Sequence, residues 1–285
     1  LTLMEEKKDA HYNAIGKHDN FNVMSNNNGL VLEIPLPFWF SKNIALALPL
    51  IALYDQDVTV GIEFESFDKL WVSSTGEKPK IPKMEDAHLE IDYVFLETPE
   101  RRRFVYQPRE YLIEQIKYQS EGIDSSNEYN RIELEFDTII KELVWVIQRN
   151  DVFDNAPNGG NETFNFSNKL SYQTTTLSPP YDIMTRANLQ FEGNDRIEER
   201  DVDYFRRTQT IMAHSRAPNN HINVISFSLG PEDFQPKGQC NFEYIDNKVL
   251  IIKILNGIIK PNCYIFAPCY NFLRIEYGMA SLFHI

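Results

Sequence analysis

Cysteine and long apolar runs are both scarce in this chain of 285 residues. Three cysteines, Cys240, Cys263 and Cys269, are too few and odd in number for a disulfide framework. They favour a reducing compartment and leave room for a single bridge. The longest apolar run, Ile44–Leu53, contains Pro49 and is half the length of about 20 residues that a membrane-spanning helix needs. The run therefore predicts a buried strand.

Basic residues are fewer than acidic ones: the chain has 28 Lys and Arg and 41 Asp and Glu, which gives a formal net charge of −13. An acidic surface repels phosphate backbones, so we expect no direct binding of nucleic acid. The first residues show no basic segment followed by a cleavable apolar one, so no secretory signal is expected. The start at Leu1 instead of Met predicts that an upstream portion is missing.

Signature motifs of catalysis, nucleotide binding and metal binding are absent from the sequence, including GxGxxG, GxxxxGK[ST], GxSxG and HExxH. His214 and His221 lie seven residues apart and could meet a metal, but we interpret them as solvated loop residues. Cys263 and Cys269 are interpreted as small buried thiols. The sequence therefore predicts no enzyme, no catalytic residue, no cofactor and no metal site.

Three other polar features each allow a functional and a structural interpretation. Closely spaced carboxylates, which glycosidases use in pairs, occur at Glu90/Asp92, Glu133/Glu135 and Glu198/Glu199. We interpret these pairs as the solvent faces of strands. Arg101–Arg103 could bind an anion or a partner's carboxylate, and a polar helix end or a subunit contact would look the same. Asn161 and Asn165 begin N-x-[ST] sequons, which carry glycans only on an exposed loop in a glycosylating compartment.

Runs of β-branched and aromatic residues, separated by Gly, Pro, Asn and Asp, predict most of the secondary structure. The expected strands are Leu30–Phe40, Ile44–Leu53, Val58–Phe67, His88–Leu96, Glu110–Gln119, Arg131–Phe136, Lys141–Arg149, Ile222–Leu229, Lys248–Leu255 and Cys263–Gly278. Helix is expected only at Pro99–Phe104 and Ile197–Arg207, and residues 151–221 are expected to form a long loop. Many strands without βαβ alternation predict an all-β protein, an antiparallel β-sandwich or jelly roll.

Residues 73–86 have the composition of a linker, with Gly76, Pro79 and Pro82 among charges of both signs. The apolar load of residues 30–67 is too great for three strands to bury alone. We therefore predict three parts: residues 1–72, a linker at 73–86, and a second domain at 87–285.

Five phrases of the sequence resemble, in family order, the major capsid proteins of nucleocytoplasmic large DNA viruses. They are PLPFWFSKNIALALPLIALYDQDVTVGIEF (Pro35–Phe64), LEIDYVFLETPERRRFVYQPREYLIEQIKYQ (Leu89–Gln119), KELVWVIQ (Lys141–Gln148), NVISFSLGPEDFQPKGQCNFEYIDN (Asn223–Asn247) and YNFLRIEYGMASLFHI (Tyr270–Ile285). The resemblance implies a jelly-roll β-sandwich, in which residues 1–72 close a first jelly roll and residues 87–285 form a complete second one.

The resemblance also implies a structural role in a virion assembled in the host cytoplasm. Such proteins form homotrimers, and the trimers are pseudo-hexagonal capsomers that tile an icosahedral shell. The implied partners are copies of the chain, neighbouring capsomers, and minor capsid and penton proteins, with the internal membrane reached only through other proteins. We expect the loop from Asp151 to Asn219 at the outer end of the capsomer.

Two other classes of function stay open at this point. The first is a lectin-like jelly-roll carbohydrate-binding module that would use exposed aromatic side chains, with Tyr172, Tyr181 and Tyr204 as candidates. The second is a sandwich-fold glycosidase, which would need two of the carboxylates above to face each other across a cleft.

Overall fold

A computed structural model of the chain describes residues 31–67, 80, 84–153, 162–170, 179–218, 221–233, 235–258 and 260–283. The chain divides into two compact units, Leu1–Leu48 and Pro49–Ile285. Within the described residues, every strand belongs to the second unit.

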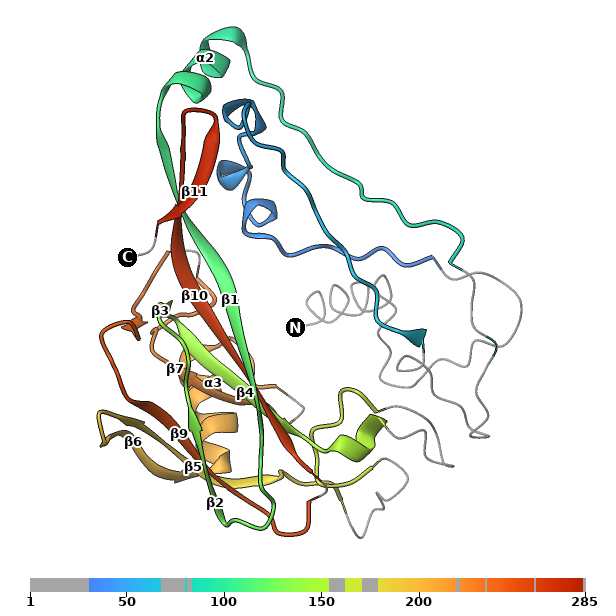
Figure 1. Cartoon of the computed structure of the whole chain (residues 1–285), viewed down its shortest axis with the longest axis vertical. Helices are drawn as coiled ribbons and strands as arrows, with labels where there is room; N and C mark the ends of the chain where they lie inside the picture. Colours follow the sequence, from blue (N-terminus) through green and yellow to red (C-terminus); the bar gives the residue numbers. More distant parts are fainter. Residues whose placement is uncertain are drawn as a thin grey trace. The chain divides into compact units, whose positions relative to one another are not determined.

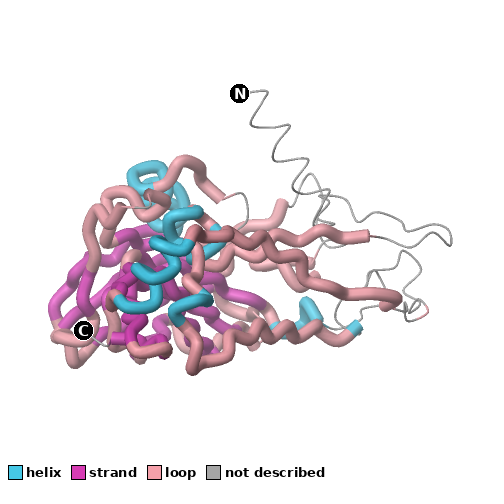
Figure 2. Tube along the Cα trace, turned by 90° about the horizontal axis from the view of Figure 1, so that it is seen from above, coloured by secondary structure: helices cyan, strands magenta, loops and turns pink. Residues whose placement is uncertain are grey.

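The strands form two antiparallel sheets (Figure 1). Their bounds are β1 (Arg109–Gly122), β2 (Tyr129–Glu133), β3 (Ile139–Ile140), β4 (Glu142–Gln148), β5 (Met184–Phe191), β6 (Asn194–Asp201), β7 (Asn223–Ser226), β8 (Cys240–Asn241), β9 (Lys248–Ile254), β10 (Asn262–Glu276) and β11 (Met279–Phe283). One sheet has the order β7-β4-β10-β3-β8, with β1 and β11 also paired to β10, and the other has the order β2-β9-β5-β6. In Figure 2 the strands lie together in one group.

The main strands pair as nested hairpins. β5 pairs with β6 at the centre, followed outward by β4 with β7, β2 with β9, and β1 with β10. Together these eight strands form one long hairpin, whose first half is β1, β2, β4 and β5 and whose second half is β6, β7, β9 and β10. Successive strands of each half belong alternately to the two sheets, so the long hairpin is wrapped around itself. Eight strands connected in this way are a jelly roll, which confirms the predicted fold class.

The helical elements are short. They are η1 (Trp39–Ser41), η2 (Ile44–Leu46), η3 (Leu50–Ala52), α2 (Thr98–Tyr106), η5 (Asn150–Phe153), η7 (Tyr204–Thr208) and α3 (Gln209–Ala213). α2 confirms the helix expected at Pro99–Phe104. Its first turn is fixed by a capping box between Glu97 and Glu100, and by a proline near its N-terminus.

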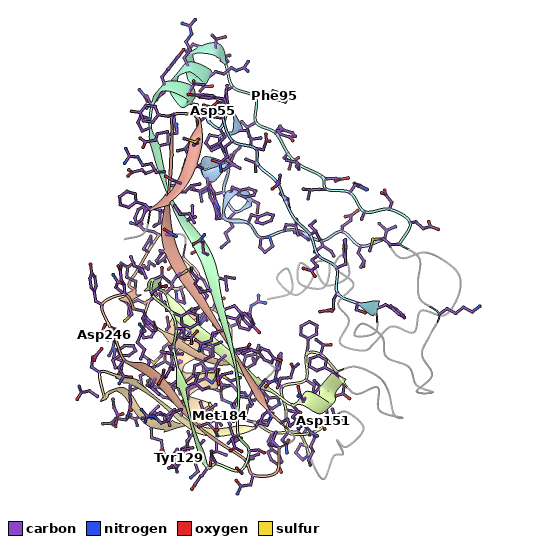
Figure 3. The ribbon with its side chains drawn as sticks, viewed as in Figure 1. Asp55, Phe95, Tyr129, Asp151, Met184 and Asp246 are labelled. Carbon is purple, nitrogen blue, oxygen red and sulfur yellow. The ribbon has the colours of Figure 1, made fainter. Side chains whose placement is uncertain are left out.

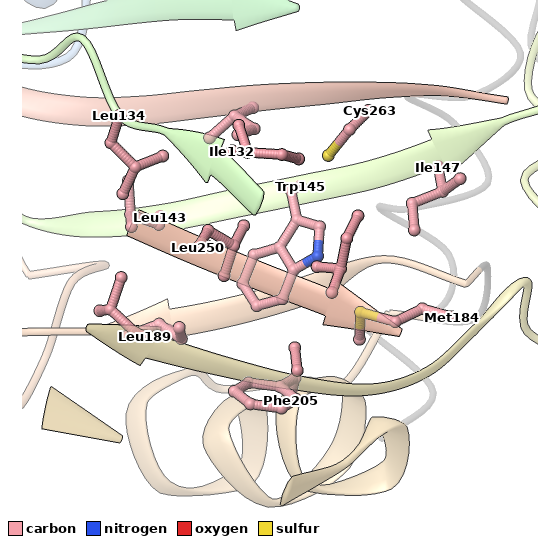
Figure 4. Packing of buried hydrophobic residues seen from close by; sticks show 14 of the residues in the cluster. Ile132, Leu134, Leu143, Trp145, Ile147, Met184, Leu189, Phe205, Leu250 and Cys263 are labelled. Atoms are coloured by element: carbon pink, nitrogen blue, oxygen red, sulfur yellow. The ribbon is translucent and has the colours of Figure 1, made fainter. Parts of the chain in front are cut away.

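The hydrophobic core lies between the two sheets (Figure 4). Side chains alternate along a strand, so Cys263, Ile265, Ala267 and Cys269 of β10 all point inward and are fully or almost fully buried. At the centre of the cluster, the ring of Trp145 meets the edge of Phe205, with centroids 5.4 Å apart. Phe205 lies on η7, so this short helical segment contributes a side chain to the centre of the core.

The nested pairing places four connections at one end of the roll, which we call the loop end. These are the connections β1–β2, β4–β5, β6–β7 and β9–β10. A hydrogen bond from Ile123 N to Pro261 O, 2.8 Å long, joins two of them. The turn between β10 and β11 lies at the opposite end, the hairpin end, where Arg109 pairs with Ile275. The two ends of the roll therefore carry different connections.

The strands expected within residues 30–67 are not formed in the part of that range that the structure describes. Ile44–Leu53 was expected to be a buried strand, but it consists of the 3₁₀ turns η2 and η3 on either side of Ala47–Pro49. Pro49 cannot donate to a ladder, which favours turns at this point. Val58–Phe64 is extended, but it pairs with none of the described strands and its apolar side chains are exposed.

The strand expected at His88–Leu96 is likewise extended and outside both sheets. Its side chains are exposed, and Phe95, labelled in Figure 3, is 94% exposed just before α2. The physical reason is the same in both segments. An extended backbone becomes a strand only when a neighbour accepts and donates its hydrogen bonds, and the described residues supply no such neighbour.

The long loop expected at residues 151–221 contains regular structure, so that prediction is wrong in part. β5 and β6 form a hairpin around Glu192 and Gly193, and η7 and α3 follow it. Part of Ile197–Arg207, which was expected to be helical, belongs to β6. Strand β6 is an almost entirely charged and polar edge strand, and it therefore lacks the apolar alternation that marks a strand in sequence.

Candidate functional site

The residues of the catalytic alternatives do not converge in the described part of the chain. Within those residues, no group of three or more His, Cys, Asp and Glu side chains could hold a metal ion. The carboxylate pairs lie apart from one another on extended segments: Glu90/Asp92 before α2, Glu133/Glu135 on and just after β2, and Glu198/Glu199 on β6. Glu198 and Glu199 form ion pairs with Arg200 and Arg186. These pairs line outer faces and make no common cleft.

At the loop end, a buried ionic cluster joins the β4–β5 and β6–β7 connections. Asp182 Oδ1 lies 2.7 Å from His221 Nδ1, and Asp182 Oδ2 accepts a hydrogen bond from Arg206. Burial acts to raise the pKa of Asp182, but the hydrogen bonds and charges of His221 and Arg206 outweigh it and lower that pKa. The cluster fixes the two long connections to each other.

A second ion pair fixes the start of the β4–β5 connection. The Arg149 guanidinium binds both carboxylate oxygens of Asp151 and also donates to the carbonyl of Asn168. Both charged side chains are almost fully buried. A bidentate pair of this kind sets direction as well as distance, so it fixes the path of the chain near Asp151, labelled in Figure 3.

His214 lies between two carboxylates at the end of α3. Its Nε2 is 2.9 Å from Glu142 Oε2 on β4, and its Nδ1 is 3.3 Å from Glu232 Oε1. The interaction with Glu142 raises the pKa of His214, burial opposes it, and the charges of Glu142 and Glu232 raise it further. The imidazole therefore links the connection after β7 to α3 and β4.

The two histidines were therefore singled out correctly in the sequence but interpreted wrongly as solvated. Each is mostly buried and paired with a carboxylate, His214 with Glu142 and Glu232, and His221 with Asp182. Sequence reasoning missed these partners because they come from elements far away along the chain. Only the nested pairing of the roll brings them together.

At the hairpin end, residues just after η3 hold the β10–β11 turn. Asp55 N donates to Gly278 O at 3.2 Å, and Ala280 N donates to Gln56 Oε1 at 2.7 Å. Gly278 has φ +84°, and a Cβ there would lie 2.7 Å from the ring of Tyr54. α2 lies at the same end, since β1 begins three residues after the helix ends and pairs beside the turn. Its arginines, Arg101–Arg103, are all exposed.

The candidate residues of the lectin alternative are not grouped in the described structure. Tyr204 packs its ring edge against Phe205 and accepts a hydrogen bond from Gln209, so it belongs to the core margin. Tyr181 is half exposed, with the Lys169 ammonium 5.5 Å from its ring centroid. Tyr172 lies outside the described residues. No aromatic platform for a sugar is formed by the two that are described.

The sequon at Asn165 has its side chain engaged inside the β4–β5 connection. The Asn165 amide donates to Glu162 and to the carbonyl of Lys169, and its oxygen accepts from Ser167 N and Oγ. A glycan on Nδ2 would replace one of its two hydrogens and so remove one of the two hydrogen bonds that the amide donates. Asn161, the other sequon residue, lies outside the described residues. Glycosylation at either position stays a prediction.

Comparisons with known proteins point to one family. Residues 100–281 match the family model described as large eukaryotic DNA virus major capsid protein, and residues 1–97 match the model of the major capsid protein N-terminus. The major capsid protein of Phaeocystis pouchetii virus is 32% identical over 88% of this chain and 64% of its own length. That of Pyramimonas orientalis virus is 35% identical over 87% of this chain and 60% of its own length. The chain thus spans less than two thirds of these curated relatives.

A solved structure supports the fold. The protein in the quasi-atomic model of the PBCV-1 virus capsid superimposes with a TM-score of 0.63 at 24% identity, over 98% of this chain and 79% of that one. At this level of identity the likeness shows the fold alone. None of the helices in the described residues has the length and apolar character needed to cross a membrane.

Proposed function

The chain belongs to the family of large eukaryotic DNA virus major capsid proteins, and from this premise we propose that it builds the shell of a virion by associating with copies of itself. The subunit is a homotrimer, and its trimers tile an icosahedral shell as pseudo-hexagonal capsomers. Its place is the capsid, after assembly in the host cytoplasm, with minor capsid and penton proteins as further partners. The role is structural, as the family match supports.

The observation that carries this proposal is the apolar surface that the described chain leaves uncovered. Val58–Phe64 and Leu89–Phe95 are extended, unpaired segments with exposed Val, Ile, Leu, Tyr and Phe side chains. Apolar surface in water costs about 25 cal/mol per Å², so side chains of this kind are normally buried against a partner. Other strands, from a first jelly roll and from neighbouring subunits, would supply that cover.

We further propose the domain division that the composition predicts. Residues 1–72 contribute to a first jelly roll, residues 73–86 link it, and residues 87–285 carry the second. The roll itself begins at β1, and Leu89–Phe95 leads into it through α2 without joining either sheet.

Orientation in the shell follows from the two ends of the roll. The loop end carries the long β4–β5 and β6–β7 connections, which we place on the outer face of the capsomer. Protease digestion of intact particles tests this assignment. Cleavage within residues 151–219 before the particle is opened is expected, and full protection until disruption would contradict it.

Light scattering and negative-stain electron microscopy test the proposed function itself. We expect the purified protein to give a trimer mass at micromolar concentration, and particles from infected cells to show a hexagonal lattice of capsomers. A protein that stays monomeric and is absent from particles would contradict the proposal.

A further inference from the structure

The helix α2 presents positive charge on a strongly acidic protein. Arg101, Arg102 and Arg103, called here the arginine cluster, are consecutive, and at 3.6 residues per turn they spread over about 200° of the helix surface. All three are exposed. The sector that the arginines leave free is occupied by Phe104, which is half buried, with the guanidinium of Arg109 on β1 3.7 Å from its ring centroid. Phe104 is thus the contact between this helix and the start of β1, and the arginine side chains extend into solvent beside it.

The acids on and before this helix are already in use. Glu97 and Glu100 form the capping box at the N-terminus. Within the described residues, none of the three guanidinium groups of the arginine cluster forms an ion pair, and Arg103 only donates a hydrogen bond to Gln107. Three adjacent like charges repel one another, so this arrangement gains stability when an anionic surface approaches it.

A complementary surface exists on the same chain. Glu133, Glu135 and Asp137, called here the acidic row, follow each other at alternate positions along β2 and just beyond it. All three are exposed, whereas Ile132, Leu134 and Phe136 between them are buried in the core. Among the described residues, the three carboxylates form no ion pair with any cation. The row is thus held rigidly by the core-facing residues that alternate with it.

The two surfaces cannot neutralise each other within one chain. The side chain of Gln119 on β1 bonds to the backbone of Glu133 and Glu135, which fixes the acidic row beside Gln119. From Arg109 to Gln119 the strand rises about 3.3 Å per residue, or about 33 Å in all, and α2 lies beyond Arg109. Charges screen each other over about 8 Å at physiological salt. Each surface is therefore free to meet the opposite charge on another molecule.

We propose that the arginine cluster of one copy binds the acidic row of a second copy. The inference rests on the proposed self-assembly and names one of its contacts. Because the two surfaces differ and lie far apart on the subunit, the contact is head-to-tail, and repetition of it closes a ring or extends a lattice. Arginine is suited to the role, since its planar guanidinium binds carboxylates through two parallel hydrogen bonds.

A charge-swap experiment on the whole chain tests this contact. One variant carries R101E, R102E and R103E, and a second carries E133K, E135K and D137K. Self-association is measured by sedimentation velocity at low and at physiological salt. We expect each variant to associate about tenfold or more weakly than the unaltered protein at low salt, because attraction becomes repulsion at every contact.

Rescue distinguishes a direct contact from a general effect of charge. The chain that carries all six substitutions is expected to regain association fully, since opposite charges face each other again at every contact. An equimolar mixture of the two variants is expected to regain it in part, because contacts between unlike variants are attractive but a ring of three cannot alternate them throughout. The control variant K117E/R196E/K260E makes the same change in net charge as R101E/R102E/R103E at exposed sites on other elements. It should associate nearly as the unaltered protein does.

The same variants also test whether the substitutions disturb folding and whether a different anion binds the arginine cluster. Circular dichroism with thermal melting verifies that each variant is folded, which matters most for R103E because Arg103 lies in the last turn of α2, where the helix dipole favours a cation. If the arginine variant loses association but neither the six-fold variant nor the mixture regains it, another anion occupies the cluster and the proposal is overturned. Assembly that is unaffected by either reversal overturns this inference alone, and a chain that never associates overturns both it and the proposed function.

Discussion

Single buried side chains join the two sheets of the roll, and Trp145 is the largest of them. It is fully buried against Phe205, and its indole N–H has no hydrogen-bond partner among the described residues. We expect Trp145→Ala to lower the free energy of unfolding by about 3–5 kcal/mol through the cavity it leaves. Trp145→Phe should cost much less, about 1.5 kcal/mol or below, because it also removes the unpaired donor.

Urea unfolding followed by far-ultraviolet circular dichroism checks both values for Trp145. Ile116→Ala, on the exposed face of β1, is the control and should change the stability by about 0.5 kcal/mol or less. Equal losses for the alanine and phenylalanine variants would show that the indole N–H is paired after all.

The cysteines should be inert in the folded protein. Burial raises the pKa of Cys240, Cys263 and Cys269, so the reactive thiolate is scarce at neutral pH. All three are free thiols in the structure. We expect a thiol reagent such as Ellman's to detect three thiols only after denaturation, with slow labelling before it. Immediate labelling of Cys263 in the native protein would contradict its burial in the core.

His214 should make stability depend on pH. Its pKa is raised in the folded state by Glu142 and Glu232, so its contribution is complete below the unfolded value of 6.5 and disappears as the pH rises through the higher folded value. Hydrogen bonds with Ser215 and His214 lower the pKa of Glu232 in spite of its burial, so acid below about 4.5 weakens the interaction as well.

The comparison of the unaltered protein with His214→Gln checks this dependence. The difference in free energy of unfolding should be greatest between about pH 5 and 6.5 and should shrink at higher pH. Asp124→Asn, at an exposed turn, is a control that should show no such change above pH 6. A difference that grows with pH would mean that His214 is stabilised in its neutral form.

At the scale of secondary-structure elements, the two tight hairpin turns have similar φ values but different surroundings. The β5–β6 turn has Glu192 and Gly193 at φ +52° and +76°, and the β10–β11 turn has Tyr277 and Gly278 at φ +52° and +84°. Both pairs have the positive φ values that two-residue hairpins require. A Cβ at Gly193 would meet open space, whereas one at Gly278 would overlap Tyr54 and Asp55.

Alanine at these two glycines therefore separates the cost of backbone conformation from that of close contact. Gly193→Ala should cost about 1 kcal/mol for its positive φ alone. Gly278→Ala should cost about 1–3 kcal/mol more, because residues 54–56 have to move away from the turn. Thermal melting of the two variants gives the comparison, and equal losses would show that the hairpin end is loosely packed.

Sequence patterns predicted the strands whose apolar alternation matches their burial. They gave wrong predictions where the presence or absence of a neighbouring strand decides whether a segment becomes a strand. β1, β2, β4, β7, β9 and β10 fall on six of the predicted strands. Val58–Phe64 has the alternation of a strand but no neighbour to bond with. β6 has a neighbour but almost no apolar residue, and the only signal that could have found it is the Glu192-Gly193 turn. The histidine partners could not be predicted, since they depend on long-range topology.

For the whole molecule, the predicted linker should be the first site of proteolytic cleavage. Gly76, Pro79 and Pro82 disfavour strand and helix, so brief trypsin digestion should cut within residues 73–86, where several lysines lie. A chain that begins near Lys83 should be more soluble than residues 1–285, because it lacks the apolar residues 30–67.

The shortened chain would also lose the bonds from Asp55 and Gln56 to the β10–β11 turn. Hydrogen exchange should therefore be faster at Met279–Phe283 in the short chain than in the whole one, with the core of the roll unchanged. Early cleavage inside β1–β10, or a short chain that does not fold, would show that the division into domains is wrong.

The nested pairing of the strands also decides when the roll can form during synthesis. β5 meets β6 as soon as a two-residue turn has been made, but β1, which begins the roll, has to wait for β10. The entropy of closing so long a loop grows only with the logarithm of its length, so the finished roll loses little stability. The rate suffers more, since distant pairing folds slowly and leaves strand edges open to other nascent chains. Many copies are made side by side on one polysome. The yield of folded subunits therefore depends on whether β1 avoids pairing with other nascent chains until its own β10 has been translated, at Glu276.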